Sequence, residues 1–390
     1  MRTYQRPRAA FLADFRRVAE ASLIQADILH SKALPTLQAL VVYIAALRKL
    51  DPGHASWSLL GLVVRLAQAL NLDRESPDES FFQSQIRRRL WHHICVLDSF
   101  FAYDRGSDYL IGPGILSRPL PTNLNDDDFD EISQASNVRA RQGEFTDMNF
   151  ALYQQEIFLE GHRRNLATTP QASSIESRIA TMKTRHKELE QIYMAHCDVN
   201  IPFQRLTIRI GRLSADMSLL TTARPFSSST PNTLLPIDTP WIVEMAMDVL
   251  RQTDELYKDT EVVQWVRRLD WTQWHPLVIV LSHLCSARGT PEAENAWDLV
   301  DRVMSYAGLH IADTTAGKLW RPLEMLYRKA QNFRLGVRID ISLLVQPQLP
   351  ENMAISVNQA GLMPFMDQSE DFFATNQWFN LQVVNAEPYI

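Results

Sequence analysis

Apolar residues recur at three- and four-residue intervals through most of this sequence, and this periodicity is the strongest constraint on its fold. In one segment they are Leu37, Leu40, Val41, Ile44 and Leu47. Such spacing places the apolar side chains on one face of an α-helix. Glycine is scarce, at 13 of 390 residues, and no alternating strand pattern is visible. The sequence therefore predicts an all-α fold in the form of a large multi-helix bundle.

The same pattern divides the chain into expected helices at 8–29, 37–47, 55–72, 85–103, 143–166, 173–196, 201–222, 241–257, 271–286, 291–307 and 315–334. Turn residues separate these segments, and the periodicity is lost beyond about residue 347. We therefore expect a single bundle domain over residues 1–335, followed by a poorly structured C-terminal tail over residues 336–390.

The overall charge of the chain argues against nucleic-acid binding. The formal net charge is -6 and the isoelectric point is about 5.9. Binding to nucleic-acid phosphates needs clustered Lys and Arg, so this chain by itself is a poor nucleic-acid binder.

The three cysteines of this chain lie far apart and indicate neither disulfides nor a zinc cluster. The cysteine pattern therefore favours an intracellular, reducing compartment. The N-terminus lacks a continuous hydrophobic region and the sequence has no run of about 18 apolar residues, so we expect a protein that is neither secreted nor membrane-spanning.

The helix expected at 85–103 carries charged residues toward its apolar face. Helical geometry places Arg87, Trp91 and Asp98 within about 60° of one another, at the edge of the apolar stripe. Arg87 and Asp98 lie about 16 Å apart along the axis, so each needs a partner on another segment. We predict Arg65 as the partner of Asp98. The triplet 87–89 is interpreted as one buried arginine with two solvated neighbours.

An acidic run, Asp126 to Asp128, raises an alternative function. Clustered carboxylates can hold Mg²⁺, which would make the protein a metal-dependent enzyme. Pro121 and Asn123 place these carboxylates in a loop, where aspartates before a helix are also favoured as N-caps. His92-His93 and His196-Cys197 are adjacent pairs whose side chains point about 100° apart on a helix, and no third ligand lies at a usable spacing. His275 and His283, with Cys285, are too far apart along one helix to share a metal, and common catalytic motifs are absent. We therefore expect no enzyme, no cofactor and no resident metal.

The C-terminal tail mixes acidic and aromatic residues. They are Asp367, Glu370, Asp371, Phe372, Phe373, Trp378 and Phe379. This composition is typical of disordered activation segments that fold onto a coactivator. The alternative is a frayed terminus that packs its aromatic rings back onto the bundle.

Four segments, 36–41, 61–74, 87–91 with Asp98, and 120–129, resemble in order and spacing the middle regulatory region of fungal zinc-cluster transcription factors. This region is the fungal-specific transcription factor domain. The residues that carry its structural signature are Arg65, Arg87, Trp91, Asp98, Pro121, Asn123 and Asp127. The resemblance extends more loosely to about residue 335.

The resemblance implies a nuclear transcription regulator, with the cytoplasm as an alternative location and control of secondary metabolism as an expected theme. Its partners would be the transcription machinery or regulatory proteins, with a small-molecule effector and a homodimer as further expectations. The six-cysteine zinc motif of such factors does not occur in the sequence, so zinc and DNA contacts are expected only through a missing N-terminal region. A bundle of the same ancestry that binds or converts a small apolar metabolite remains the alternative.

Overall fold

The computed structural model describes residues 7–48, 55–105, 107–112, 114, 117–166, 174–224, 239–269, 273–287, 289–310 and 320–336. Every regular element within these ranges is a helix, which confirms the expected all-α bundle for this part of the chain. The expected activation segment at 367–379 lies outside the described residues, as does the whole tail after Gly336. The division into one domain and a tail stays a prediction.

The helices of the first half are α1 (Arg8–Gln25), α2 (Leu34–Leu47), α3 (Ala55–Ala69), α4 (Phe81–Arg105), the short 3₁₀ helix η2 (Asp126–Asp128), α5 (Asn149–Leu166) and α6 (Ile175–Tyr193). The helices of the second half are α7 (Pro202–Ala223), α8 (Pro240–Lys258), α9 (Val263–Leu269), α10 (Trp274–Leu284), α11 (Pro291–His310) and α12 (Trp320–Leu335).

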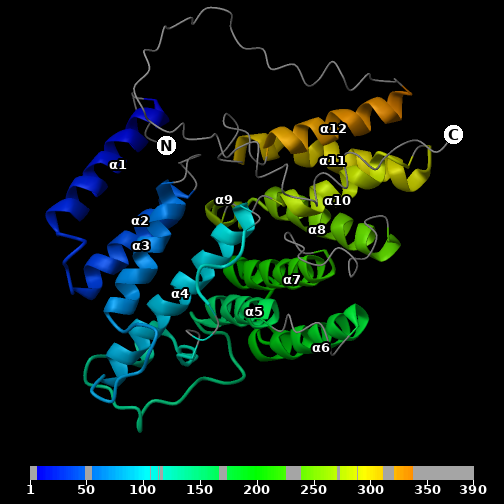
Figure 1. The fold of residues 1–390 in the computed structure, drawn as a ribbon. Helices are drawn as coiled ribbons and strands as arrows, with labels where there is room; N and C mark the ends of the chain where they lie inside the picture. Colours follow the sequence, from blue (N-terminus) through cyan, green and yellow to red (C-terminus); the bar gives the residue numbers. More distant parts are fainter. Residues whose placement is uncertain are drawn as a thin grey trace, which may run out of the picture.

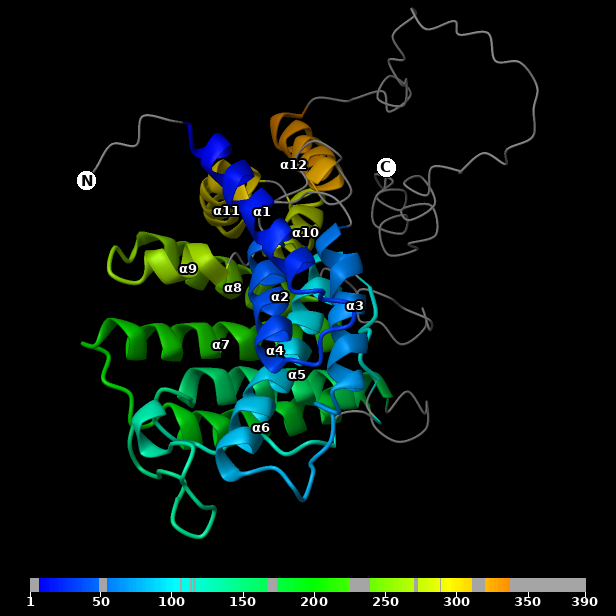
Figure 2. The same cartoon turned by 90° about the vertical axis from the view of Figure 1, so that its left-hand side faces the viewer.

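Helices α5 to α12 are stacked one above another, and α1 to α4 lie across one side of this stack (Figures 1 and 2). Within the stack, α7 packs between α5 and α8, and α8 packs on α10. Helix α4 packs on α3 and on α5, so it joins the two parts of the molecule.

Local chemistry explains where several helices start and stop. Prolines occupy the first turns of α2, α7 and α8, where the missing amide hydrogen costs nothing. Helix α1 ends at Gln25 and not at residue 29 as expected, because Asp27 adopts a left-handed conformation with φ 47°.

The start of α5 and the presence of α9 also differ from the sequence expectation. Helix α5 begins at Asn149, six residues after the predicted start at Gly143, which has φ 76°. The Thr146 hydroxyl accepts the Met148 amide while Asn149 Oδ1 accepts the Thr146 amide, a reciprocal cap that fixes the start. Helix α9 was not predicted, because its seven residues are too short to show a periodic pattern.

Three apolar clusters form the core. The largest lies among α7, α8, α10, α11 and α12 and includes Leu277 and Trp297. The second joins α2, α3 and α4 around Trp91 and Ile94, both 0% exposed. The third joins α5 and α6 around Tyr153. Helix α4 therefore has one face in the second cluster, which leaves its other residues to contact the segments on either side of it.

Candidate functional site: the polar network of helix α4

Helix α4 holds the two connecting segments on either side of it in place through polar side chains. One is the connector at residues 73–80, which precedes the helix, and the other is the loop from residue 107 to residue 148, which follows it. Gln85, His92 and Asp98 are buried polar residues of α4, with exposed fractions of 1%, 1% and 2%. Buried polar groups need hydrogen-bond partners, and here the backbone of the following loop supplies them.

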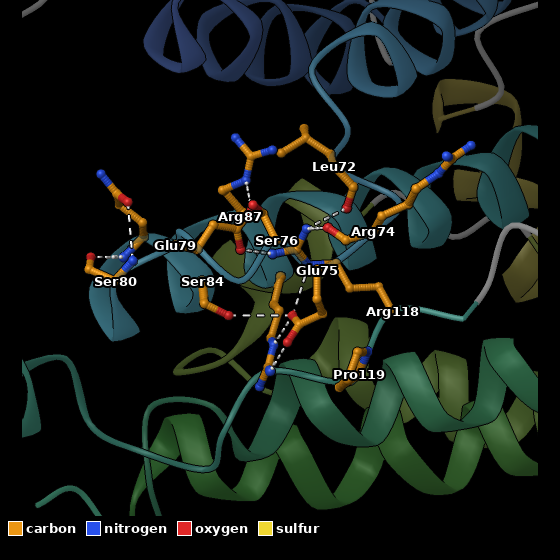
Figure 3. Close-up of polar contacts among 12 residues, drawn as sticks. Leu72, Arg74, Glu75, Ser76, Glu79, Ser80, Ser84, Arg87, Arg118 and Pro119 are labelled. Atoms are coloured by element: carbon orange, nitrogen blue, oxygen red, sulfur yellow. Dashed lines mark hydrogen bonds and ion pairs between the residues drawn. The ribbon is translucent and has the colours of Figure 1, made fainter. Parts of the chain in front are cut away.

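Arg118 of the loop lies at the centre of this network (Figure 3). Its side chain is 0% exposed, and its Nη2 lies 2.7 Å from Glu79 Oε2. Its Nη1 donates to the carbonyl oxygens of Leu72, at 3.1 Å, and Arg74. Its Nε lies 3.5 Å from Glu75 Oε1. One buried guanidinium therefore ties the loop after α4 to the connector before it.

The arginine triplet of α4 contacts the same connector. Arg87 Nε lies 2.6 Å from Glu79 Oε1, and Arg88 donates to both carboxylate oxygens of Glu75 at 2.8 and 2.6 Å. The bond from Arg88 lowers the pKa of Glu75, so this carboxyl is ionised at neutral pH. The Arg89 guanidinium donates to Asp126 at 2.5 Å.

These contacts correct the prediction that Arg88 and Arg89 are solvated neighbours of a buried Arg87. The three side chains are 20%, 18% and 22% exposed in chain order. All three are paired because acidic residues of the connector and of the loop lie on both flanks of α4. The triplet is therefore a structural clamp that joins three segments.

Asp98 is buried but does not pair with Arg65, so the predicted ion pair is wrong. Its two carboxylate oxygens accept the backbone amides of Leu110 and Ile111, at 3.1 and 2.8 Å. Arg65 is exposed on α3, and its guanidinium donates to Gln68 at 3.3 Å. Backbone amides stabilise a buried carboxylate as well as a guanidinium does, which is why burial alone could not identify the partner.

The His92 ring contacts the loop backbone at Arg118 and Pro119. Its Nε2 lies 3.2 Å from the Arg118 carbonyl oxygen and 3.0 Å from that of Pro119, so Nε2 carries the proton and donates. Burial lowers the pKa of His92 and keeps the ring neutral. The ring therefore orients the backbone that presents Arg118.

A narrow crevice lies between α4 and α5, and it is too small to hold a water molecule. Its lining consists of His92, Cys95, Val96, Gln155, Phe158 and Leu159. Pockets for small organic ligands usually measure about 300–1,000 Å³. The crevice is smaller than that, and burial raises the pKa of the Cys95 thiol, which keeps it protonated.

The loop that follows Arg118 is closed by amide and hydroxyl groups. Asn123 Oδ1 accepts the Thr146 hydroxyl at 2.5 Å, and the Asn123 side-chain amide donates to the Arg141 carbonyl oxygen at 3.2 Å. Asn149 then donates to the Tyr193 carbonyl oxygen at 2.7 Å, which connects the loop to the end of α6. Pro121, expected in this loop, is buried within it.

The acidic run at 126–128 forms the helix η2 and does not cap an α-helix as expected. Asp126 pairs with Arg89, Asp128 pairs with Arg141 at 2.5 Å, and Asp127 is exposed. The hydrogen bond from Arg141 lowers the pKa of Asp128. Two of the three carboxylates thus have arginine partners. Within the described ranges, no three His, Cys, Asp or Glu side chains are placed to share a metal ion.

The sequence interpretation missed Arg118, Glu75 and Glu79, the residues with the most contacts in the network. A signal existed: two glutamates in a short connector directly precede a helix that carries an arginine triplet in its second and third turns. Their partner Arg118 lies 39 residues after Glu79, and nothing in the local pattern distinguishes it from an exposed loop arginine.

No helix among the described residues is long and apolar enough to cross a membrane.

The connector, α4 and the following loop all lie inside a region that matches a known family. The family model described as "Fungal specific transcription factor domain" matches residues 4–197, which contain α1 to α6. Residues 4–197 therefore form a domain of this family. No solved structure matches the chain.

Curated relatives extend the similarity beyond the domain. The "C6 finger domain transcription factor nscR" of Aspergillus fumigatus is 29% identical over 84% of this chain and 44% of its own length. The protein with the same description from Trichophyton verrucosum is 27% identical over 95% of this chain and 58% of its own. The "C6 finger domain transcription factor adaR" of Aspergillus niger is 28% identical over 83% of this chain. The chain spans about half the length of these relatives.

Proposed function

We propose that this chain is the regulatory region of a fungal transcription factor. The observation that carries the proposal is the family match over residues 4–197, which contains the whole polar network of α4. The names of the relatives, all C6 finger domain transcription factors, support it. The family is one of transcription factors, which favours a regulatory and not an enzymatic role.

The proposed mechanism is conformational. The helical bundle would bias the access of protein partners to the acidic and aromatic segment at 367–379. Partners would be other regulatory proteins or the transcription machinery in the nucleus, with a small-molecule effector or a second copy of the chain as further inputs. The zinc of a C6 finger would be held by cysteines other than Cys95, Cys197 and Cys285, which are free and lie far apart in the sequence.

A reporter assay tests this function. The 390-residue chain is fused to a foreign DNA-binding domain, beside a version from which residues 363–390 are removed. We expect the full fusion to activate the reporter and the shortened fusion to lose that activity. Equal output from both fusions and from the DNA-binding domain alone, at equal protein levels, would sink the proposal.

Side-chain variants sharpen the assay. Replacing Phe372, Phe373 and Trp378 together by Ala should remove most of the activation, because aromatic side chains supply the apolar contact with coactivators. The matched control replaces Asn376, Gln377 and Asn380 by Ala, which keeps the charge and the aromatic rings. Equal losses in the two triple variants would contradict a role for the aromatic residues.

A further inference from the structure

The connector before α4 contains the sequence Ser76-Pro77 in an exposed turn. The Glu79 amide donates to the Ser76 carbonyl oxygen at 3.2 Å, which closes a four-residue turn with Pro77 at its second position. Ser76 is exposed, and its hydroxyl oxygen accepts a long hydrogen bond of 3.4 Å from the Asp78 amide. It is the one Ser-Pro pair in the sequence. An exposed serine before proline, outside any helix, is the substrate type of proline-directed protein kinases.

The charges around this turn are balanced. Four carboxylates, of Asp73, Glu75, Asp78 and Glu79, lie in the connector. Four guanidiniums oppose them, and these belong to Arg74, Arg87, Arg88 and Arg118. Figure 3 shows Ser76 between Glu75 and Glu79, within this network. A phosphate adds a charge of about −1.5 to −2 at pH 7, which upsets the balance.

We propose that Ser76 is a phosphorylation site for a proline-directed protein kinase, and that its phosphate competes with Glu75 for Arg88. In the reaction, Ser76 Oγ bonds to the γ-phosphorus of ATP while the bond from that phosphorus to the β-phosphate oxygen breaks. ADP leaves, and the serine proton passes to the catalytic base of the kinase.

Exposure decides which arginine the phosphate reaches. The Arg88 side chain is 18% exposed and its partner Glu75 is 39% exposed, whereas Arg118 is 0% exposed beneath them. A phosphate, like a carboxylate, can bind a guanidinium through two parallel hydrogen bonds, and its larger negative charge of about −1.5 to −2 strengthens the contact. Glu75, displaced from Arg88, then faces an excess of negative charge, and the connector loosens from α4. Phosphorylation therefore weakens the attachment of the connector.

The first experiment measures labelling of the folded 390-residue chain by a proline-directed kinase with radiolabelled ATP. Labelling should map to Ser76 by mass spectrometry, be absent at this position in Ser76→Ala, and fall strongly in Pro77→Ala. Circular dichroism verifies that both variants are folded. Lack of phosphate at position 76 in the wild-type chain, or equal labelling of that position in Pro77→Ala, would overturn the assignment.

The second experiment measures the melting temperature before and after phosphorylation. We expect a decrease of at least about 2 °C, and a larger decrease in Arg88→Gln, where the phosphate lacks its guanidinium. Arg212→Gln is the matched control. Arg212 forms an ion pair with Glu190, with 2.6 Å between Nε and Oε1, and neither residue belongs to the connector. An unchanged melting temperature, or the same decrease in Arg88→Gln as in the wild type, would refute the competition. Both readouts use the chain alone, so they stand or fall independently of its role in transcription.

Discussion

Helix α4 and helix α10 contact their neighbours through different chemistry. Arg87, Arg88 and Arg89 of α4 reach the connector and the loop through ion pairs with carboxylates, and the buried pair of Arg118 and Glu79 joins the loop directly to the connector. Helix α10 packs on α8 and α12 mainly through aliphatic side chains, of which Leu277, Ile279 and Leu281 are each 0% exposed. A hydrogen bond connects the two regions, because the Trp274 indole donates to the Tyr103 carbonyl oxygen at 3.1 Å.

This difference indicates which part of the domain would change its structure if a charge were added to it. Burial of apolar surface is favourable wherever shapes fit, and it does not depend on a specific partner. A buried ion pair recovers its desolvation cost only with one geometry, and it becomes strongly unfavourable when one partner is lost. The α10 region is therefore a source of stability, whereas the α4 network fixes the position of two loops and is sensitive to added charge.

Removal of the central guanidinium should have the largest effect. Arg118→Ala leaves Glu79 in a buried site with one arginine fewer, so we expect a loss of about 3–5 kcal/mol in the free energy of unfolding. Urea denaturation followed by circular dichroism measures it. The control Arg65→Ala, on an exposed arginine, should stay within about 0.5 kcal/mol of the wild type. A loss below about 1 kcal/mol for Arg118→Ala would show that the network is not a structural element.

A cavity in the α10 region should have a similar cost but a different response to salt. Leu277→Ala removes a fully buried side chain, and we expect a loss of about 2–5 kcal/mol. Because no charge is involved, this loss should be the same at low and high NaCl concentration. Urea denaturation at both concentrations provides the comparison. A loss that shrinks with salt would contradict the apolar character of this region.

Acid should weaken the α10 region before it breaks the outer ion pairs. Burial lowers the pKa of His275 to about 3 from its usual 6.5, so protonation favours the unfolded chain. Neutral, buried His275 makes its full contribution to the free energy of unfolding above pH 6.5. This contribution decreases as the pH falls, and at pH 5 it is smaller by about 2 kcal/mol. The pKa of Glu75 is instead lowered by Arg88, so that pair persists until the pH falls below about 4.5.

Urea denaturation at pH 7, 6 and 5 measures the acid effect. The variant His275→Gln, which cannot bind a proton, should show a flatter dependence on pH than the wild type does. Equal slopes in the two proteins would mean that His275 does not control this range.

The outer pair of the network should have the smallest effect. Arg88→Gln removes a partly exposed ion pair with Glu75, and we expect a loss of about 0.5–1 kcal/mol at low salt. The loss should shrink in high salt, because surface pairs are screened. Arg212→Gln, on a more exposed pair, should cost less. A loss in Arg88→Gln as large as that in Arg118→Ala would erase the distinction between the outer and the buried pairs.

Part of this network could be predicted from the sequence. Helical geometry placed Trp91 and Asp98 toward the inside of α4, and both are buried. It also indicated that Arg87 needs a partner on another segment, and that partner is Glu79. The choice of Arg65 for Asp98 failed because the rotation of α3 relative to α4 is set by packing. The amides that Asp98 binds belong to a loop whose path no periodicity describes.

The sequence by itself determined that the chain is a bundle of helices, because the apolar spacing along each segment decides that locally. The order of its motifs also indicated the family. Only the tertiary structure decided which arginine meets which carboxylate. Arg118 and Glu79 are 39 residues apart, and two charges so far apart in the chain meet only when α4, which lies between them, has packed into the bundle. The packing of the apolar faces fixes that geometry, and the ion pairs then select one position for each loop.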